Sequence, residues 1–182
     1  MSDVDINVKE NIRRLMSLAY SVALKSPDPS SQNGALLYHR YDNIVVATAC
    51  NDFPSGIVHS EERWNDRNLK YPRVEHAESG VLYSAFRNGV FHRNLIKNLI
   101  MVCPWAACTG CVKTMIGFGL KHVIVHGPAM ALNHGKWIAD NEISQSMVKE
   151  NGIKFETYYG DVDDVIIRRD SKPFNPNEQQ KI

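Results

Sequence analysis

Residues 99–126 read LIMVCPWAACTGCVKTMIGFGLKHVIVH. The apolar run Leu99–Cys103 at the start and the run His122–His126 at the end are each typical of a buried strand. The residues between them predict a helix that runs from Cys111 to Phe118 and ends at Gly119. A strand, a helix and a second strand in this order favour a parallel crossover, and therefore an α/β fold.

The alternation of strands and helices continues on both sides of this segment. Periodic apolar residues and turn signals predict, in chain order, a helix over Val8–Lys25, strands over Ala35–Tyr38 and Ile44–Cys50, a helix over His76–Arg87, a helix over Lys136–Glu150 and a strand over Ile153–Tyr159. The order αββαβαβαβ predicts a layered α/β sandwich with a mixed sheet, antiparallel in the first hairpin and parallel in the later crossovers.

Length sets the number of domains. A chain of 182 residues is long enough for one full core and too short for two ordinary domains. We therefore expect one domain over residues 1–160 and a polar, flexible C-terminal extension over residues 161–182. From Ser171 onward the extension is polar and interrupted by proline, which predicts a segment that is poorly ordered or packs against a neighbouring subunit.

Charge and hydropathy exclude several classes of protein. The chain is 43% hydrophobic and 23% charged, and its formal net charge of +1 argues against a nucleic-acid-binding surface or a polybasic membrane patch. The segment Met1–Glu10 has acidic residues and no apolar core, unlike a secretory signal, and no apolar run is long enough to span a bilayer. We expect no nucleic-acid or membrane partner and a cytoplasmic location.

Two short motifs predict a metal centre: His76-Ala77-Glu78 and Cys108-Thr109-Gly110-Cys111. His76, Cys108 and Cys111 are zinc-type ligands, and three protein ligands leave the fourth tetrahedral position open for water, as in catalytic zinc sites. Glu78 is the natural proton carrier for such a water, because it lies two residues beyond His76 and does not compete for the metal.

The cysteine motif alone has other interpretations. Cys108-x-x-Cys111 by itself is more often a structural zinc knuckle or a redox pair. A structural knuckle needs a second ligand pair, and neither Cys50 nor Cys103 has the required spacing. The upstream His-x-Glu motif therefore favours catalytic zinc.

The motifs and their surroundings resemble the deoxycytidylate (dCMP) deaminases, a family of the zinc-dependent cytidine deaminase superfamily with a His-x-Glu and Pro-Cys-x-x-Cys signature. The resemblance covers about Ile12 to Tyr158. It is carried by Asp28–Ala35, Asn51–Gly56 and Leu69–Glu78 as well as by the ligands. It implies a three-layer α/β/α sandwich with a mixed five-stranded sheet, the cytidine deaminase-like fold.

The resemblance also implies a function. It predicts hydrolytic deamination of dCMP to dUMP and ammonia, which supplies dUMP for thymidylate synthesis, with a catalytic Zn²⁺ on His76, Cys108 and Cys111 and with Glu78 as the catalytic carboxyl group. The family resemblance further implies a homo-oligomer, commonly a hexamer, that dCTP with Mg²⁺ activates and dTTP inhibits.

The polar stretch Asn51–Arg73 lacks clear periodicity, and a loop of this length in a compact domain is usually functional. We expect substrate-binding and regulatory contacts there, with Asn51 touching the deoxyribose or the base. Trp64 and Trp105 are candidates for stacking on a base. The predicted substrate contacts are Asn51, Lys70, Tyr71, Ala77 and Trp105. The cations available to a 5′-phosphate are Arg63, Arg67, Lys70 and Arg73, although a solvated loop of mixed charge explains them equally well.

Two departures from the family pattern keep rival functions open. Ala107 stands where the family usually has Pro, and Ser79-Gly80 follows the His-x-Glu motif, where close packing over the zinc site is one reason for the glycine. The rivals are a deaminase of another free or modified cytosine nucleotide or nucleoside, and a zinc- or nucleotide-binding module without catalysis. The presence of Glu78 argues against the second, since a structural site has no use for it.

Overall fold

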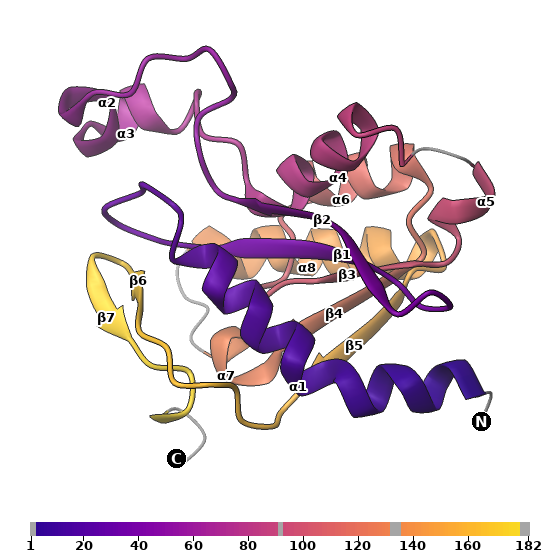
Figure 1. Ribbon diagram of the computed structural model, residues 1–182. Helices are drawn as coiled ribbons and strands as arrows, with labels where there is room; N and C mark the ends of the chain where they lie inside the picture. The colour runs from indigo at the N-terminus through magenta and orange to yellow at the C-terminus, as the bar shows by residue number, and fades with distance from the viewer. Residues whose placement is uncertain (1–2, 91–92, 132–135, 179–182) are drawn as a thin grey trace.

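A mixed five-stranded sheet forms the centre of the molecule (Figure 1). The computed structural model describes residues 3–90, 93–131 and 136–178. Within them the strands of this sheet are, in spatial order, β2 (Ile44–Cys50), β1 (Gly34–His39), β3 (Leu99–Val102), β4 (His122–His126) and β5 (Lys154–Tyr158). β1 pairs antiparallel with β2 and β3, whereas β3, β4 and β5 are parallel. The predicted antiparallel hairpin and parallel crossovers are confirmed.

The inner strands are apolar on both faces because both faces are covered. Every residue of β1 is buried. Ala35 and Leu37 point into one core, and Leu36 and Tyr38 point into the other, as the two-residue period of a strand requires. These strands therefore read as continuous apolar runs rather than as an alternation of apolar and polar residues.

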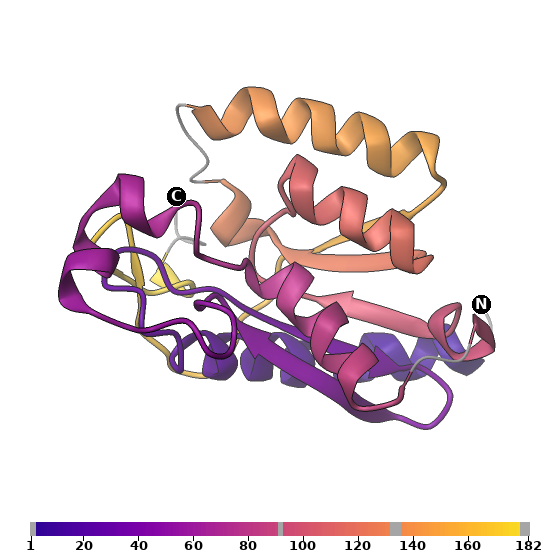
Figure 2. The same cartoon turned by 90° about the horizontal axis from the view of Figure 1, so that it is seen from above.

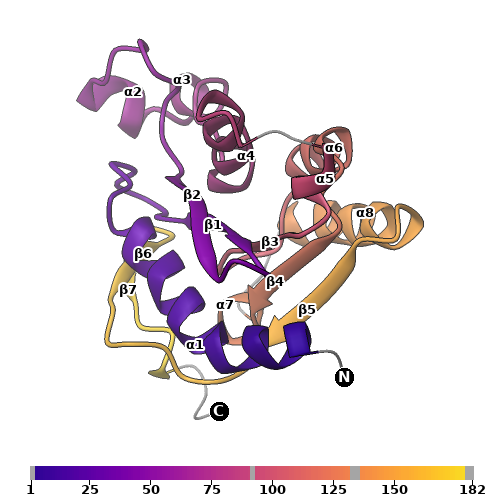
Figure 3. The ribbon, with the colours of Figure 1, turned by 45° about the vertical axis from the view of Figure 1, so that its right-hand side comes forward.

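Helices cover the two faces of the sheet. α4 (Ala77–Arg87), α6 (Thr109–Phe118) and α8 (Lys136–Glu150) lie on one face, and α1 (Asp3–Ala23) lies on the other (Figures 2 and 3). Two short helices, α5 (Arg93–Ile96) and α7 (Gly127–Met130), lie in the connections next to β3 and β4. This is the predicted three-layer α/β/α sandwich. Within the described residues, no helix has the length and apolar character needed to cross a membrane.

The start of β1 approaches the backbone of α1 closely at Gly34. A Cβ atom on this residue would lie 2.3 Å from the carbonyl oxygen of Ala19 and 2.5 Å from the amide nitrogen of Ala23. Only glycine lets the start of β1 approach the helix backbone this closely. The helix itself extends further toward the N-terminus than its predicted start at Val8, and it ends at Ala23.

The stretch Asn51–Arg73 contains two short helices, α2 (Glu61–Asn65) and α3 (Arg67–Lys70), which project beyond β2 (Figure 1). The hydroxyl of Ser60 accepts a hydrogen bond from the Arg63 amide, and the Asp66 carboxylate accepts one from the Asn68 amide. Such side chains cap helix N-termini. The absence of a periodic signal is explained by length, because a helix of one turn cannot display a repeat.

The C-terminal extension folds back onto the domain as far as residue 178. β6 (Ile167–Arg169) and β7 (Lys172–Phe174) form an antiparallel hairpin, and Ile167 and Phe174 are buried in the core that includes α1. Two apolar anchors thus hold the hairpin against the domain, while the flexibility expected for residues 161–182 stays a prediction. Residues 179–182 lie outside the described residues, and the domain boundary at residue 160 stays a prediction.

Candidate zinc and nucleotide site

The four residues of the two motifs come together at the start of two neighbouring helices. His76 immediately precedes α4 and Glu78 lies in its first turn, while Cys108 immediately precedes α6 and Cys111 lies in its first turn. α4 packs against β1 and β2, and α6 packs against α4 and α8. The fold thus brings together motifs that are far apart in the sequence.

The spacing of the three ligand atoms matches a tetrahedral metal centre. Nδ1 of His76 lies 3.4 Å from Sγ of Cys108 and 3.6 Å from Sγ of Cys111, and the two sulfurs are 3.6 Å apart. Zn²⁺ with bonds of about 2.3 Å to sulfur and 2.0 Å to nitrogen requires edges of about 3.8 Å between sulfurs and 3.5 Å between sulfur and nitrogen. In the described residues, these three side chains form the one cluster able to hold a metal ion.

The electrostatics of the cluster also fit a cation. Hydrogen bonding from Cys111 and then from His76 lowers the pKa of Cys108 to about 4, and the hydrogen bond with Cys108 raises the pKa of His76 to about 9. The neighbouring Cys108 sulfur, together with burial, raises the pKa of the Cys111 thiol. A dication removes the cost of a second thiolate, since it neutralises both sulfurs and takes the place of the proton on His76. The donor set therefore fits Zn²⁺.

Glu78 is a buried carboxyl group with an unsatisfied oxygen. Its side chain is on the wall of the same cavity, the residue is 3% exposed, and Oε2 has no hydrogen-bond partner among the described residues. Burial raises its pKa to about 7. A carboxyl group that titrates near neutrality can both accept and donate a proton, which is the property that a general acid–base catalyst needs.

The departure from the family pattern at Ser79-Gly80 places a serine beside the metal cluster. The hydroxyl of Ser79 lies 3.4 Å from Sγ of Cys111 and 3.3 Å from the hydroxyl of Thr114, and its single proton can be donated to one of them at a time. A Cβ on Gly80 would lie 3.4 Å from Cβ of Ala49 on β2. That distance is ordinary van der Waals contact, so the packing of α4 on β2 leaves room for a methyl group at Gly80, whereas Ser79 touches the metal cluster.

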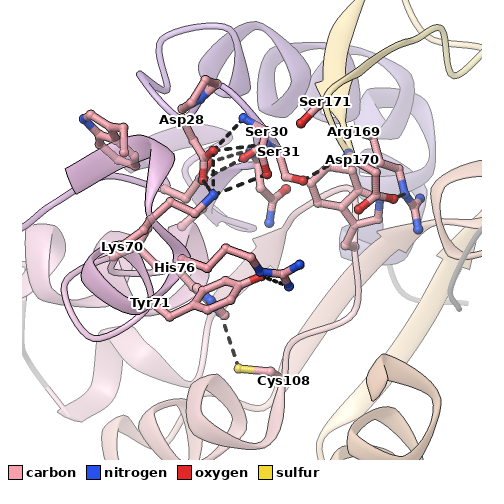
Figure 4. A pocket seen from close by; sticks show the side chains of 18 of the residues that line it. Asp28, Ser30, Ser31, Lys70, Tyr71, His76, Cys108, Arg169, Asp170 and Ser171 are labelled. Atoms are coloured by element: carbon pink, nitrogen blue, oxygen red, sulfur yellow. Dashed lines mark hydrogen bonds and ion pairs between the residues drawn. The ribbon is translucent and has the colours of Figure 1, made fainter. Parts of the chain in front are cut away.

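A cavity of about 660 Å³ opens above the cluster, which is within the usual size range of small-molecule sites. His76 and Cys108 lie at its base in Figure 4, and Asp28 and Lys70, from two different segments, lie on one side. Arg169, Asp170 and Ser171 of the C-terminal hairpin lie on the other side. All five predicted substrate contacts line it: Asn51, Lys70, Tyr71, Ala77 and Trp105. Sequence patterns missed the hairpin residues, because no motif marks a segment so distant in the chain.

Asn51 and Lys70 belong to a buried polar network in the cavity wall. Nζ of Lys70 donates to both carboxylate oxygens of Asp28, at 3.0 and 3.2 Å, and to the hydroxyl of Ser30, at 3.3 Å. Nδ2 of Asn51 donates to the Ser31 carbonyl at 2.8 Å and to Asp28 at 3.3 Å.

The donors of both side chains are therefore in use. Oδ1 of Asn51 accepts the Asn33 amide proton at 2.7 Å, and the second lone pair of this oxygen has no hydrogen-bond partner among the described residues. The three ammonium protons of Lys70 match its three acceptors. The sequence showed the residue types, but their mutual pairing depends on the fold.

The aromatic and cationic candidates divide between ligand-facing and structural positions. Trp64 stacks on Phe53 with ring centroids 3.9 Å apart, so one face of its indole is covered. The guanidinium of Arg169 lies 5.2 Å from the centre of the Trp105 ring. Of the loop cations, Arg67 and Lys70 line the cavity, whereas Arg63 and Arg73 donate to the backbone carbonyls of Val58 and Leu69.

Comparison with known proteins agrees with this geometry. A family model described as the cytidine and deoxycytidylate deaminase zinc-binding region matches residues 9–127. The chain belongs to this deaminase family. The matched segment contains His76, Glu78, Cys108 and Cys111, whereas β5 and the C-terminal hairpin lie outside it.

Two relatives within the family are deoxycytidylate deaminases. The protein of Pongo abelii is 31% identical over 116 residues, which cover 60% of this chain and 60% of the relative. The protein of Mus musculus is 30% identical over 135 residues, which cover 68% of this chain and 71% of the relative. The chain thus spans between three fifths and three quarters of the length of these relatives.

The crystal structure of the dCMP deaminase from cyanophage S-TIM5, solved with dCMP and dUMP, superposes with a TM-score of 0.57. The match covers 87% of this chain and 99% of the phage chain at 19% sequence identity. This likeness confirms the cytidine deaminase-like fold that the sequence predicts.

Proposed function

We propose that this deaminase family member hydrolyses dCMP to dUMP and ammonia. The observation that carries the proposal is the buried Glu78 carboxyl group, in the same cavity as a three-ligand zinc-type cluster and with an oxygen that has no hydrogen-bond partner among the described residues. A structural metal site has no need for such a carboxyl group. The named activity of the deoxycytidylate deaminase relatives supports the choice of substrate.

Glu78 performs the proton transfers in the proposed mechanism. A Zn²⁺ bound by His76, Cys108 and Cys111 supplies the Lewis acidity that makes an attacking water acidic near neutral pH. The Glu78 carboxylate accepts the proton of that water and delivers it to N3 of cytosine, which makes C4 more electrophilic. After the water oxygen has added at C4, Glu78 takes the remaining proton of that oxygen and delivers it to the departing amino group. Water is consumed, ammonia leaves, and uracil remains.

The cavity wall supplies binding and orientation. We assign Asn51 as an acceptor for a sugar hydroxyl, because its oxygen keeps one lone pair while both of its amide protons are in use. Ala77, Tyr71 and Trp105 contribute the surface around the base. Lys70 acts through Asp28, which it holds in the wall.

The remaining parts of the proposal rest on the sequence resemblance. They are a cytoplasmic location, a homo-oligomer with a hexamer as the expected form, activation by dCTP with Mg²⁺ and inhibition by dTTP. Mass photometry and activity titrations with each nucleotide test them. A monomer whose rate responds to neither nucleotide contradicts this regulatory part and leaves the chemistry intact.

The first test of the function is ammonia release by zinc-loaded protein supplied with dCMP, deoxycytidine, dCTP and a base-modified dCMP. Each reaction is run with and without dCTP and Mg²⁺ as effector. We expect turnover of dCMP and at least tenfold less of the others. Preference for a modified nucleotide favours the rival deaminase, and no turnover at one zinc per chain favours a binding module.

The role of Glu78 is tested by Glu78→Gln, which keeps the shape of the side chain and removes its acid–base function. We expect a bound zinc, an unchanged circular dichroism spectrum, and a loss of kcat of at least 10²-fold, as for removal of a general acid–base. Glu75→Gln is the matched control, because Glu75 lies three residues away and is not part of the cavity lining. Equal rates for Glu78→Gln and the unmodified protein would falsify the assignment.

A further inference from the structure

One side chain from a third helix touches the turn that carries the two cysteines. Oδ2 of Asp140, on α8, accepts a hydrogen bond from the backbone amide of Thr109 at 3.0 Å, and Oδ1 accepts one from the Thr109 hydroxyl at 2.8 Å. Both oxygens of the carboxylate are thus used on one residue. Thr109 stands between the two ligands, directly after Cys108 and two residues before Cys111.

This contact replaces a cap that the helix lacks. Cys108 occupies the N-cap position of α6, and its side chain makes no capping hydrogen bond. Its sulfur faces His76 and Cys111 instead. A helix N-terminus has four amide groups without intrahelical partners, and side-chain oxygens commonly satisfy them. A carboxylate from α8 supplies that oxygen here, which frees the N-cap side chain to serve as a metal ligand.

The orientation of this turn decides where both sulfurs lie. Cys108 and Cys111 belong to the same helix start, whereas the third ligand, His76, lies at the start of α4. A rotation of the first turn of α6 would move two of three ligand atoms away from the third. A bidentate, charge-assisted contact at Thr109 opposes such a rotation.

We propose that Asp140 is a positioning residue for the metal ligands: it fixes Thr109 so that Cys108 and Cys111 face His76 at metal-binding distance. Residues outside the ligand set often tune metal affinity in this way, and their loss typically costs 10- to 100-fold. The inference concerns how the zinc is retained. It stands whether the substrate is dCMP or another nucleotide.

The test measures how fast zinc leaves the holoprotein. Purified, zinc-loaded protein is mixed with an excess of a chromogenic chelator, and the release rate is followed by absorbance. We expect Asp140→Ala to release zinc about 10- to 100-fold faster than the unmodified chain. Glu142→Ala is the control, because it removes an exposed carboxylate from the same helix two residues away and makes none of these contacts. It should leave the rate unchanged.

A second pair of variants acts from the other side of the contact. Thr109→Val removes the hydroxyl and keeps the backbone amide, so we expect a smaller acceleration than for Asp140→Ala. Thr109→Ser restores a hydroxyl and should return the rate toward that of the unmodified chain. If Asp140→Ala does not fold, the zinc release rates of the two Thr109 variants test the role of the contact in its place.

Two results would overturn the proposal. One is a release rate for folded Asp140→Ala, or for Thr109→Val if the first variant does not fold, within twofold of the unmodified protein. The other is a lower unfolding midpoint of the metal-free protein with unchanged zinc release, which would make Asp140 a helix cap alone. Neither readout depends on turnover of dCMP, so failure of the proposed function leaves this test valid.

Discussion

The ammonium of Lys70 and the carboxylate of Asp28 form an ion pair whose side chains are only 6% and 5% exposed. Lys70→Met leaves the Asp28 charge buried without its partner, which should lower the free energy of unfolding by about 3–5 kcal/mol. The double variant Asp28→Asn with Lys70→Met should recover part of this loss, since neither charge remains. Urea unfolding measures both, and equal losses for the single and double variants contradict the prediction.

An exposed ion pair, compared with the buried pair of Lys70 and Asp28, tests how much burial contributes to the strength of such a pair. Arg13 and Asp163 lie 2.9 Å apart with side chains that are 63% and 71% exposed. Solvent screens such pairs, so Arg13→Met should change the free energy of unfolding by only about 0–1 kcal/mol. A loss as large as that for Lys70→Met would show that distance alone, rather than burial, sets the strength of these pairs.

Among the secondary-structure elements, the contact between α1 and β1 depends on the absence of a side chain at Gly34. In Gly34→Ala the new methyl group would meet backbone atoms, which cannot rotate away, so we expect a loss of about 1–3 kcal/mol. Gly117→Ala is the contrast, because a Cβ there meets nothing within 4 Å. Alanine within α6 should raise stability by up to about 1 kcal/mol. Thermal unfolding of the two variants should therefore shift in opposite directions.

His126 of β4 links α1 to the segment after β5 and should make their packing sensitive to pH. Nδ1 lies 2.8 Å from the Tyr20 hydroxyl of α1, Nε2 lies 3.0 Å from the Gly160 carbonyl, and burial lowers the His126 pKa. The carbonyl can only accept, so Nε2 carries the proton and Nδ1 accepts from Tyr20. Below about pH 6.5 the unfolded chain binds a proton that the fold excludes, so the free energy of unfolding falls with acidification.

The measurement for this pH effect is urea unfolding at pH 7.0 and 5.5. We expect the stability lost over this range to be smaller in His126→Gln, which cannot titrate, than in the unmodified chain. The charge of Asp161 opposes the lowering of the His126 pKa. His122, on the same strand, also has a lowered pKa, so part of the pH dependence of stability should remain in the variant. An unchanged slope in His126→Gln contradicts the assignment.

For the whole molecule, the C-terminal hairpin completes the cavity wall. Arg169 is on the cavity side with a side chain 13% exposed, and Arg168 beside it is exposed and absent from the lining. If the substrate carries a 5′-phosphate, Arg169→Ala should raise KM for dCMP about tenfold or more, since charge-assisted hydrogen bonds to phosphate are strong. Arg168→Ala should leave KM unchanged.

The Arg169 prediction needs a control for folding, because its guanidinium also donates to the Ala129 carbonyl at 2.5 Å. A fall in kcat together with a lower unfolding midpoint indicates structural damage rather than lost phosphate binding. A raised KM with unchanged kcat and midpoint supports the phosphate role. Equal KM values for Arg169→Ala and Arg168→Ala contradict it.

The fold class and the cluster of metal ligands could be predicted because their sequence signals are local. Apolar runs of strand length, helix stops such as Gly119, and the two short motifs each lie within a few neighbouring residues, so the sheet, its parallel crossovers and the cluster of His76, Cys108 and Cys111 could be predicted. The one-turn helices α2 and α3 were not predicted, because they are too short to show a hydrophobic period.

Tertiary structure decided how the residues of the cavity wall pair and which distant segments complete it. Asp28 pairs with Lys70, Asp140 reaches Thr109, and the hairpin brings Arg169 to the cavity, although nothing in the local sequence links the members of each pair. Such contacts between distant segments follow from burial of apolar anchors, as at Ile167 and Phe174. The amino-acid order thus specifies which chemistry is available, whereas the packing of distant elements specifies which donors are already engaged and which remain for a ligand.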